Sequence, residues 1–211
     1  EPGNLKSKRL PNLQAVIKIG GSIERGFIEF QEVAGKASEK DKDRIKDLTN
    51  ILQFDDPINI QFTSGTTGFP KGATLTHFNV LNNGYFTGES LKFTSDDRLC
   101  VPVPLYHCFG MVLSNIAALT HGAALIYPDE AFDPLSVLEA VQEEKCTGLH
   151  GVPTMFIAEL EHPRFKEFDL SSLRTGIMAG SPCPIEIMRR VVDEMYCSEM
   201  IIAYGMTETS P

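Results

Sequence analysis

The chain has 211 residues, of which 42% are hydrophobic and 22% charged, values typical of a globular protein with a sizeable core. Its formal net charge is −9. Residues 61–211 carry 18 acidic and 9 basic side chains, whereas residues 1–60 carry ten of each. This acidic balance, without a basic stripe, argues against nucleic acid or an anionic membrane as the main partner.

The cysteines and the apolar runs exclude two further classes. Five cysteines are scattered without a C-x-x-C pair, which predicts neither a zinc site nor a disulfide framework. We expect buried thiols in a reducing compartment at Cys100, Cys108, Cys146, Cys183 and Cys197. No membrane span is predicted, because the run "GMVLSNIAALTHGAALIYP" is interrupted by Asn115, His121 and two glycines and stays below the roughly 18 apolar residues required.

The first 60 residues have a less regular pattern than the rest. Residues 13–20 ("LQAVIKIG") and 26–33 ("GFIEFQEV") are predicted to be strands. Residues 37–52 are highly charged and predict a solvated helix or loop.

From Asp97 onward, short β-rich runs alternate with helical patterns, which is typical of βα units on a mainly parallel sheet. Asp133 is expected to cap a helix that begins at Pro134, and Gly122 to end an earlier one. Runs such as "MIIAY" predict strands buried on both faces. The strands are expected at 98–105, 123–128, 146–152, 173–180 and 199–205, and the helices at 108–122, 133–145, 153–161 and 184–196. The predicted fold class is α/β with flanking helices.

A loop rich in glycine, serine and threonine, "FTSGTTGFPKG" (residues 62–72), follows the strand-like "PINIQ". Glycines allow successive backbone amides to point at one anion, and Lys71 adds a positive charge. The loop differs from G-x-x-x-x-G-K-[ST], because Gly72 follows the lysine. Composition alone leaves two interpretations open, a phosphate-binding loop and an ordinary hairpin or surface turn.

The order of residues in this loop favours the first interpretation. "TSGTTGFPKG" resembles the phosphate-loop signature of the adenylate-forming superfamily, which contains acyl-CoA synthetases, luciferases and the adenylation domains of peptide synthetases. The resemblance implies that the loop binds the β- and γ-phosphates of ATP. The residues implied are Thr63, Ser64, Gly65, Thr66, Thr67, Gly68, Pro70, Lys71 and Gly72.

Two further motifs of the superfamily follow in order. "PLYHCFG" (residues 104–110) is similar to the segment beside the reacting carboxylate and the α-phosphate, which implies that role for His107. "GVPTMF" (residues 151–156) is similar to a turn that lines the acyl pocket. Taken alone, His107 could equally be a hydrogen-bonded core residue and "GVPTMF" simple core packing.

The last two motifs concern the nucleotide and the metal. "AGSPCP" (residues 179–184) resembles the adenine-binding turn, which implicates Gly180, Ser181 and Pro182. "YGMTETSP" (residues 204–211) resembles the motif in which Tyr204 stacks on adenine beside Gly205. In that motif Thr207 contacts the α-phosphate and Glu208 helps to hold Mg²⁺, although outside the motif Glu208 could be merely solvated. Together with Lys71 and His107, these two are the expected catalytic residues.

The remaining histidines have no metal-ligand spacing and are predicted to be structural or surface residues. They are His77, His121, His150 and His162.

The combination of "DPINIQFTSGTTG" with "PLYHCFG", "AGSPCP" and "YGMTE" resembles most closely the medium-chain acyl-CoA synthetases of the family-member-2 type. Adenylation domains of peptide synthetases more often have proline where this chain has Met206. The resemblance implies a fatty-acid–CoA ligase. It would form acyl-AMP from a carboxylic acid and ATP with Mg²⁺, and then acyl-CoA from CoA. The alternatives are an aryl-acid or 4-coumarate-type CoA ligase and a non-catalytic nucleotide-binding protein.

The resemblance also implies how the chain is organised. Residues 55–211 would form the AMP-binding core, and residues 1–54 part of the preceding segment of the same domain. The ribose-binding aspartate and the C-terminal domain with its lysine are not found in the sequence. We therefore expect a central piece of a longer enzyme, inactive by itself. The motif style suggests a bacterial cytoplasm, with the mitochondrial matrix as the eukaryotic alternative.

Overall fold

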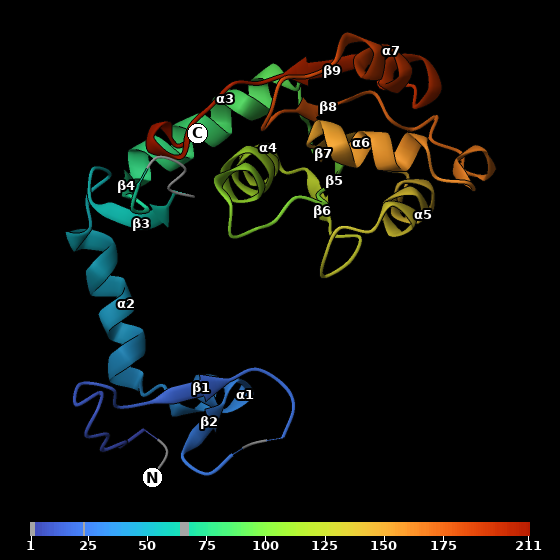
Figure 1. Cartoon of the computed structure of the whole chain (residues 1–211). Helices are drawn as coiled ribbons and strands as arrows, with labels where there is room; N and C mark the ends of the chain where they lie inside the picture. Colours follow the sequence, from blue (N-terminus) through green and yellow to red (C-terminus); the bar gives the residue numbers. More distant parts are fainter. Residues whose placement is uncertain (1–2, 23, 64–67) are drawn as a thin grey trace. The chain divides into compact units, whose positions relative to one another are not determined.

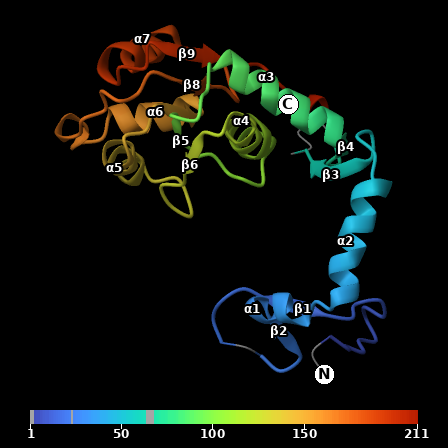
Figure 2. The same cartoon turned by 180° about the vertical axis from the view of Figure 1, so that it is seen from behind.

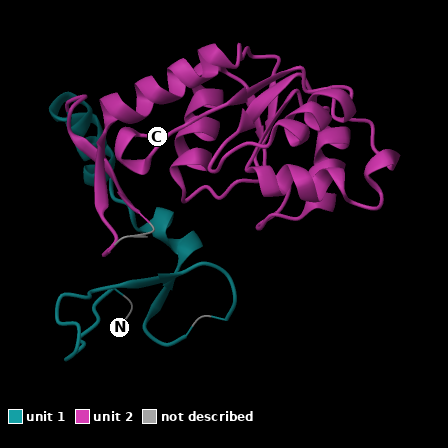
Figure 3. Cartoon of the chain, turned by 45° about the horizontal axis from the view of Figure 1, so that its top comes forward, with its two compact units in different colours: residues 1–52 teal, residues 53–211 magenta. Residues whose placement is uncertain are grey.

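The computed structural model describes residues 3–22, 24–63 and 68–211. The chain forms two compact units, residues 1–52 and residues 53–211 (Figure 3). The predicted division of a single domain into residues 1–54 and residues 55–211 stays a prediction.

The first unit is small. Strands β1 (Val16–Lys18) and β2 (Phe27–Glu29) pair in parallel, and are followed by α1 (Phe30–Val33), a 3-10 turn (Ala34–Lys36) and α2 (Glu39–Ile51). The strand predicted over residues 26–33 is wrong beyond Glu29, because Phe30 and Val33 share one face of a helical turn.

Helix α2 confirms the prediction of a charged, solvated segment. None of its residues is buried. The helix begins with a capping box, in which Asp41 N–H donates to Ser38 Oγ and Ser38 N–H donates to the Asp41 carboxylate.

The second unit contains a five-stranded parallel sheet in the order β6-β5-β7-β8-β9 (Figure 1). This confirms the predicted α/β class with a mainly parallel sheet. The strands are β5 (Arg98–Cys100), β6 (Ala124–Ile126), β7 (Gly148–Gly151), β8 (Thr175–Met178) and β9 (Glu199–Ile202). A separate antiparallel pair, β3 (Pro57–Phe62) and β4 (Gly72–Thr76), precedes the sheet along the chain.

Helices cover both faces of the sheet (Figure 1, Figure 2). On one side lie α3 (His77–Ser90) and a π-helical segment, Phe109–Ile116, that continues into α4 (Ala117–His121). On the other side lie α5 (Pro134–Glu144), α6 (Pro153–Leu160) and α7 (Ile185–Glu194).

Successive strand residues alternate between the two hydrophobic layers. Leu99 and Ile177 pack in the layer with Phe109 and Leu113, whereas Cys100, Leu149 and Met178 pack in the layer with Phe156 and Val191. The period of two in side-chain direction therefore divides a continuously apolar strand between two helix layers.

Helix α3 was not predicted, because its two glycines lower its helix propensity. The same glycines allow close packing against the neighbouring helical segment. A Cβ at Gly84 would lie 2.4 Å from Ile116 Cγ2, and one at Gly88 would lie 2.3 Å from His121 Nδ1. Thr76 caps the helix through a capping box with Asn79.

Two strand predictions need correction. The strand expected over residues 98–105 ends at Cys100, since Pro102 and Pro104 have no N–H to continue the ladder. Strand β9 was expected to be buried on both faces, but it lies at the sheet edge, where Ile202 is 58% exposed.

The helix signals are confirmed. Asp133 caps α5 by accepting from Ser136 N–H, with Pro134 as the first helical residue. Gly122 ends α4 with a left-handed φ of 72°. All five cysteines are free thiols, and four of them are buried. Within the described parts of the chain, no helix combines the length and the apolar character needed to cross a membrane.

The amino ends of four strands are joined by an ion pair between a buried carboxylate and a partly exposed arginine. Asp97, which precedes β5, accepts hydrogen bonds from Arg174, which precedes β8, at 2.8 and 3.1 Å. Thr147, before β7, donates to the same carboxylate at 2.6 Å. Arg174 also pairs with Glu199, the first residue of β9, at 3.2 Å. One cluster therefore joins four neighbouring strands of the sheet.

Electrostatics of this cluster favour ionised Asp97. Burial raises the pKa of Asp97, but hydrogen bonds from Arg174, Thr147 and Thr94 outweigh it and leave the pKa below its usual range. The carboxylate therefore stabilises the fold at pH values above about 4, the unfolded pKa, and this contribution is lost as the pH falls through the lower folded pKa.

We predict that Arg174→Met lowers the free energy of unfolding by about 3 kcal/mol, because it leaves the Asp97 carboxylate buried without its cation. The measurement is chemical denaturation at neutral pH. Arg189→Met is the matched control, since it removes only an exposed pair with Glu186 and should change stability by less than about 1 kcal/mol. Equal losses of unfolding free energy in both variants would contradict the conclusion that this cluster holds the amino ends of the strands together.

Candidate active site

An open cleft of about 740 Å³ lies where several loops of the second unit meet. It is lined by residues from the β3–β4 connection, from the segment after β5, and from the segments that follow β8 and β9. Ligands of open parallel sheets bind beyond the carboxyl ends of the strands. The cleft lies at the carboxyl ends of the strands, and the ion pair of Asp97 and Arg174 lies at their amino ends.

The cleft brings together predicted residues from four separate motifs. The described lining residues that were predicted are Thr63, Gly68, Lys71, His107, Gly180, Gly205, Thr207 and Glu208. Residues 63 and 208 are far apart in sequence, so their presence in one cleft is a result of the fold.

Other predicted residues lie outside this lining. Pro70, Gly72, Ser181 and Pro182 belong to the same loops but do not line the cleft. Ser64, Gly65, Thr66 and Thr67 lie outside the described residues.

Tyr204, expected to stack on adenine, lies beside the main cleft and not among its lining residues. Its side chain is 91% exposed, and it lines a smaller hollow of about 190 Å³. This hollow shares His107, Gly180, Gly205 and Pro211 with the main cleft. Its other lining residues include the apolar Phe109 and Leu113 and the polar Asn83 and Thr87. The two hollows are therefore adjacent and meet at His107.

The charged groups of the cleft form one ion pair. Lys71 Nζ lies 2.9 Å from Glu208 Oε1, and this pair connects the candidate phosphate-binding loop to the turn at Thr207–Thr209. Thr63 supports the lysine, because Thr63 N–H donates to Lys71 O at 2.9 Å and Lys71 N–H donates to Thr63 Oγ1 at 3.1 Å. Hydrogen bonding to Lys71 lowers the pKa of Glu208 below its usual range.

Glu208 carries the only carboxylate side chain among the described residues that line the cleft. The described residues contain no group of three or more His, Cys, Asp or Glu side chains that could form a complete metal site. One exposed carboxylate suits Mg²⁺, which is usually bound by one or two carboxylates with water and substrate phosphates. The donor set therefore fits a magnesium ion that arrives with a phosphate ligand.

His107 is oriented by the backbone that follows it. Phe109 N–H donates to His107 Nδ1 at 3.1 Å, so in the neutral ring the proton is on Nε2. Hydrogen bonding to the Cys108 thiol raises the pKa of His107, whereas partial burial lowers it. The imidazole is thus a candidate hydrogen-bond donor to an anion in the cleft.

Cys108 was missed as a site residue, because it was treated as one of five ordinary buried thiols. Its sulfur lies 3.8 Å from His107 Nδ1 and 3.7 Å from Thr207 Oγ1, and so connects two motifs. Burial raises the pKa of Cys108, but hydrogen bonding with His107 and Thr207 outweighs burial and lowers it overall. Its position next to His107 in the sequence was the available signal.

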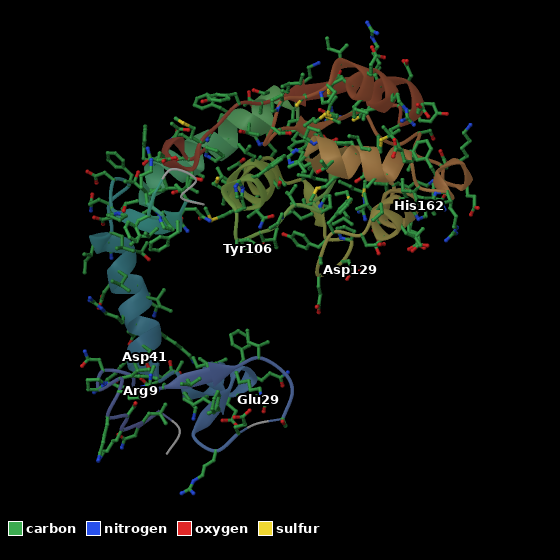
Figure 4. All side chains as sticks on the ribbon, viewed as in Figure 1. Arg9, Glu29, Asp41, Tyr106, Asp129 and His162 are labelled. Atoms are coloured by element: carbon green, nitrogen blue, oxygen red, sulfur yellow. The ribbon has the colours of Figure 1, made fainter. Side chains whose placement is uncertain are left out.

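Aromatic residues of the cleft were also missed. Tyr106, labelled in Figure 4, is 83% exposed, and its backbone oxygen accepts a hydrogen bond from the Gln61 side chain. Phe69 is 96% exposed. Both residues lie within the predicted motifs. The sequence does not distinguish an aromatic ring that lines a cleft from one that merely faces solvent.

Two glycines are required by the geometry of the cleft. Gly180 has φ = 88°, a left-handed conformation that places the turn after β8 at the cleft. A Cβ at Gly110 would lie 2.4 Å from Pro104 O, so the loop that carries His107 closes tightly only with glycine there.

We predict that Lys71→Met raises the pKa of Glu208 back toward its usual range, because the cation that lowers it is removed. The measurement is a ¹³C NMR titration of the glutamate carboxyl groups. Lys42→Met, which removes an exposed pair with Glu39 in the first unit, is the control and should leave Glu208 unchanged. An unaltered Glu208 titration in Lys71→Met would show that the ion pair is absent in solution.

The chain is similar to known proteins along nearly its whole length. The sequence pattern described as "AMP-binding enzyme" matches residues 5–211. "Putative acyl-CoA synthetase YngI" of Bacillus subtilis (strain 168) is 52% identical over the whole chain, and "Medium-chain acyl-CoA ligase ACSF2, mitochondrial" of Danio rerio is 47% identical, also over the whole chain. The chain spans 38% and 35% of the length of these two relatives.

Solved structures agree in fold. The anthranilate CoA ligase AuaEII in complex with anthranoyl-AMP superposes with a TM-score of 0.78 at 25% identity, over 96% of this chain and 38% of that one. ATP-bound MatB from Rhodopseudomonas palustris superposes with a TM-score of 0.64 at 31% identity, over 75% of this chain and 31% of that one. The pattern match over nearly the whole chain shows that the protein belongs to the AMP-binding enzyme family.

Proposed function

We propose that the protein is an ATP-dependent fatty-acid–CoA ligase. In the first step a carboxylate oxygen attacks the α-phosphorus of ATP, forming acyl-AMP and releasing pyrophosphate. In the second step the thiol of CoA attacks the acyl carbon, giving acyl-CoA and AMP. The observation that carries this proposal is the meeting of Lys71, His107, Thr207 and Glu208 in one cleft.

The charge arrangement suits the first step. Attack of a carboxylate on a phosphate ester brings two anions together, so positive charge and oriented donors lower the barrier. Lys71 supplies positive charge, and Thr63 and Gly68 line the cleft beside it. Ser64, Gly65, Thr66 and Thr67, with Pro70 and Gly72, complete the phosphate loop of this proposal.

Lys71 and Glu208 neutralise each other in the free protein, and each has a separate role once ATP binds. Lys71 would pair with the phosphates, while Glu208, with phosphate oxygens and water, would hold Mg²⁺. When bound, the metal supplies positive charge to the phosphates. The charges of Lys71 and Glu208 would therefore both remain neutralised by a partner in the complex.

His107 and Thr207 provide donors near the reacting atoms. With Phe109 N–H on Nδ1, the Nε2–H of neutral His107 can donate to the substrate carboxylate or to an α-phosphate oxygen. The Thr207 hydroxyl lies in the same cleft, 3.7 Å from Cys108 Sγ. No side-chain nucleophile is required, because the substrate itself attacks.

The adenine is proposed to bind where the turn after β8 meets the segment after β9. The exposed ring of Tyr204 offers a flat stacking surface, and Gly205 follows it. Gly180, Ser181 and Pro182 form the opposing turn.

Lys71→Ala is predicted to lower the rate of carboxylate-dependent ATP–pyrophosphate exchange by about 100-fold, because one preorganised charge at the phosphates is lost. The assay uses the full-length protein with octanoate. Lys166→Ala, at an exposed lysine that does not line the cleft, is the control and should exchange normally. Near-normal exchange by Lys71→Ala would refute the phosphate role of this loop.

The acid is proposed to be a medium-chain fatty acid. The name of the Danio rerio relative supports an alkyl chain. The anthranilate ligase among the similar structures keeps an aryl acid as the alternative. A bacterial cytoplasm is the proposed location, with the mitochondrial matrix as the eukaryotic alternative.

A substrate screen separates these acids. We expect octanoate to give a kcat/KM at least about tenfold above those of 4-coumarate and anthranilate, since methylene groups bound in a hydrophobic pocket each contribute roughly 1 kcal/mol or more. Acetate serves as the short-chain control and should be a poor substrate. A preference for either aromatic acid would replace the fatty-acid assignment but keep the ligase chemistry.

A further inference from the structure

Two buried polar side chains beneath the cleft have no role in the proposed chemistry. His150, in β7, and Ser114, in the π-helical segment, are both fully buried. His150 Nδ1 lies 2.9 Å from Ser114 Oγ, and Ser114 Oγ lies 3.1 Å from Phe109 O. The imidazole lies between aromatic rings, with centroid distances of 6.5 Å to Phe93 and 5.6 Å to Phe109.

The direction of these hydrogen bonds follows from the number of protons. A carbonyl oxygen only accepts, so the Ser114 hydroxyl donates to Phe109 O and its oxygen accepts from His150 Nδ1–H. Burial lowers the pKa of His150 to about 3, and the ring is therefore neutral. Its Nε2 is left as a buried acceptor without a hydrogen-bond partner among the described residues.

An apolar pair at these positions would avoid the unsatisfied nitrogen, so the polar pair calls for a reason. Phe109 supplies one. Its carbonyl accepts from Ser114, and its amide N–H donates to His107 Nδ1 at 3.1 Å. One residue thus connects the buried pair to the imidazole of the cleft, at the start of a π-helical segment, a type of structure often found at functional sites.

We propose that Ser114 and His150 are positioning residues for His107. They hold Phe109 in the orientation in which its N–H occupies His107 Nδ1, so that Nε2–H is the donor available to the bound substrate. This inference rests on the proposed adenylation role of His107. On this proposal Ser114 and His150 affect catalysis by orienting His107, in addition to any effect on stability.

The test compares Ser114→Ala, His150→Leu and the double variant in the full-length protein. Ser114→Ala leaves the buried His150 Nδ1–H unpaired and should unfold at a lower temperature than the wild type, whereas His150→Leu leaves the Ser114 hydroxyl bonded to Phe109 O and should unfold closer to the wild type. The double variant removes both groups and should regain much of the loss seen in Ser114→Ala. In ATP–pyrophosphate exchange, all three should show a roughly five- to tenfold lower kcat with an almost unchanged KM for ATP.

Thr120→Ala is the matched control. Thr120 also donates a hydroxyl hydrogen bond to its own helix, to Ile116 O at 2.9 Å, and its hydrogen-bond partners in the described part of the chain do not include Phe109 or His107. Its removal should leave kcat unchanged. A double variant that regains both stability and wild-type kcat would overturn the proposal and reduce the pair to a structural contact.

A second readout does not depend on activity. In ¹⁵N NMR of histidine-labelled protein, His107 should carry its proton on Nε2 in the wild type and in Thr120→Ala, and should lose this preference in the double variant. An unchanged His107 tautomer in the double variant would overturn the proposal. If the wild type shows no exchange while the tautomer changes as expected, the proposed enzyme function fails and the positioning of His107 still holds.

Discussion

The ion pair between buried Asp97 and partly exposed Arg174 is the interaction on which the second unit depends. It joins the residues that precede β5 and β8, and through Thr147 and Glu199 it includes β7 and β9. A parallel sheet has no short hairpins to set the alignment of its strands, so contacts at one end determine where the other end lies. With the amino ends held, the carboxyl ends deliver His107, Gly180 and Glu208 to a common cleft.

The opposite charges of the cleft partly neutralise each other. Lys71 and Glu208 pair across it, and exposed pairs of this kind contribute little to stability, so the phosphate ligand that we propose would separate them at low cost. Cys108 and Phe109, by contrast, are buried and orient Thr207 and His107 from below. The groups that must exchange partners are exposed, and the groups that must stay in place are supported from the core.

The sequence allowed the parallel α/β sheet and most of the cleft to be predicted, because capping residues, prolines and ordered motifs act locally. Asp133 caps the start of α5 and Gly122 ends α4, as expected. Helix α3 could not be predicted, since its glycines are explained only by the close approach of Ile116 and His121. The linkage of His150 to His107 was likewise invisible, because it depends on contacts between residues more than 30 positions apart.

The central claim is that the substrate's own carboxylate attacks the α-phosphorus of ATP in this cleft. The most direct measurement is mass spectrometry of the products formed by the full-length protein from ¹⁸O-labelled octanoate, ATP and CoA. The account predicts AMP that carries one ¹⁸O, because the bridging oxygen of acyl-AMP comes from the acid and leaves with AMP when CoA attacks. Unlabelled AMP, or label recovered in inorganic phosphate, would contradict it.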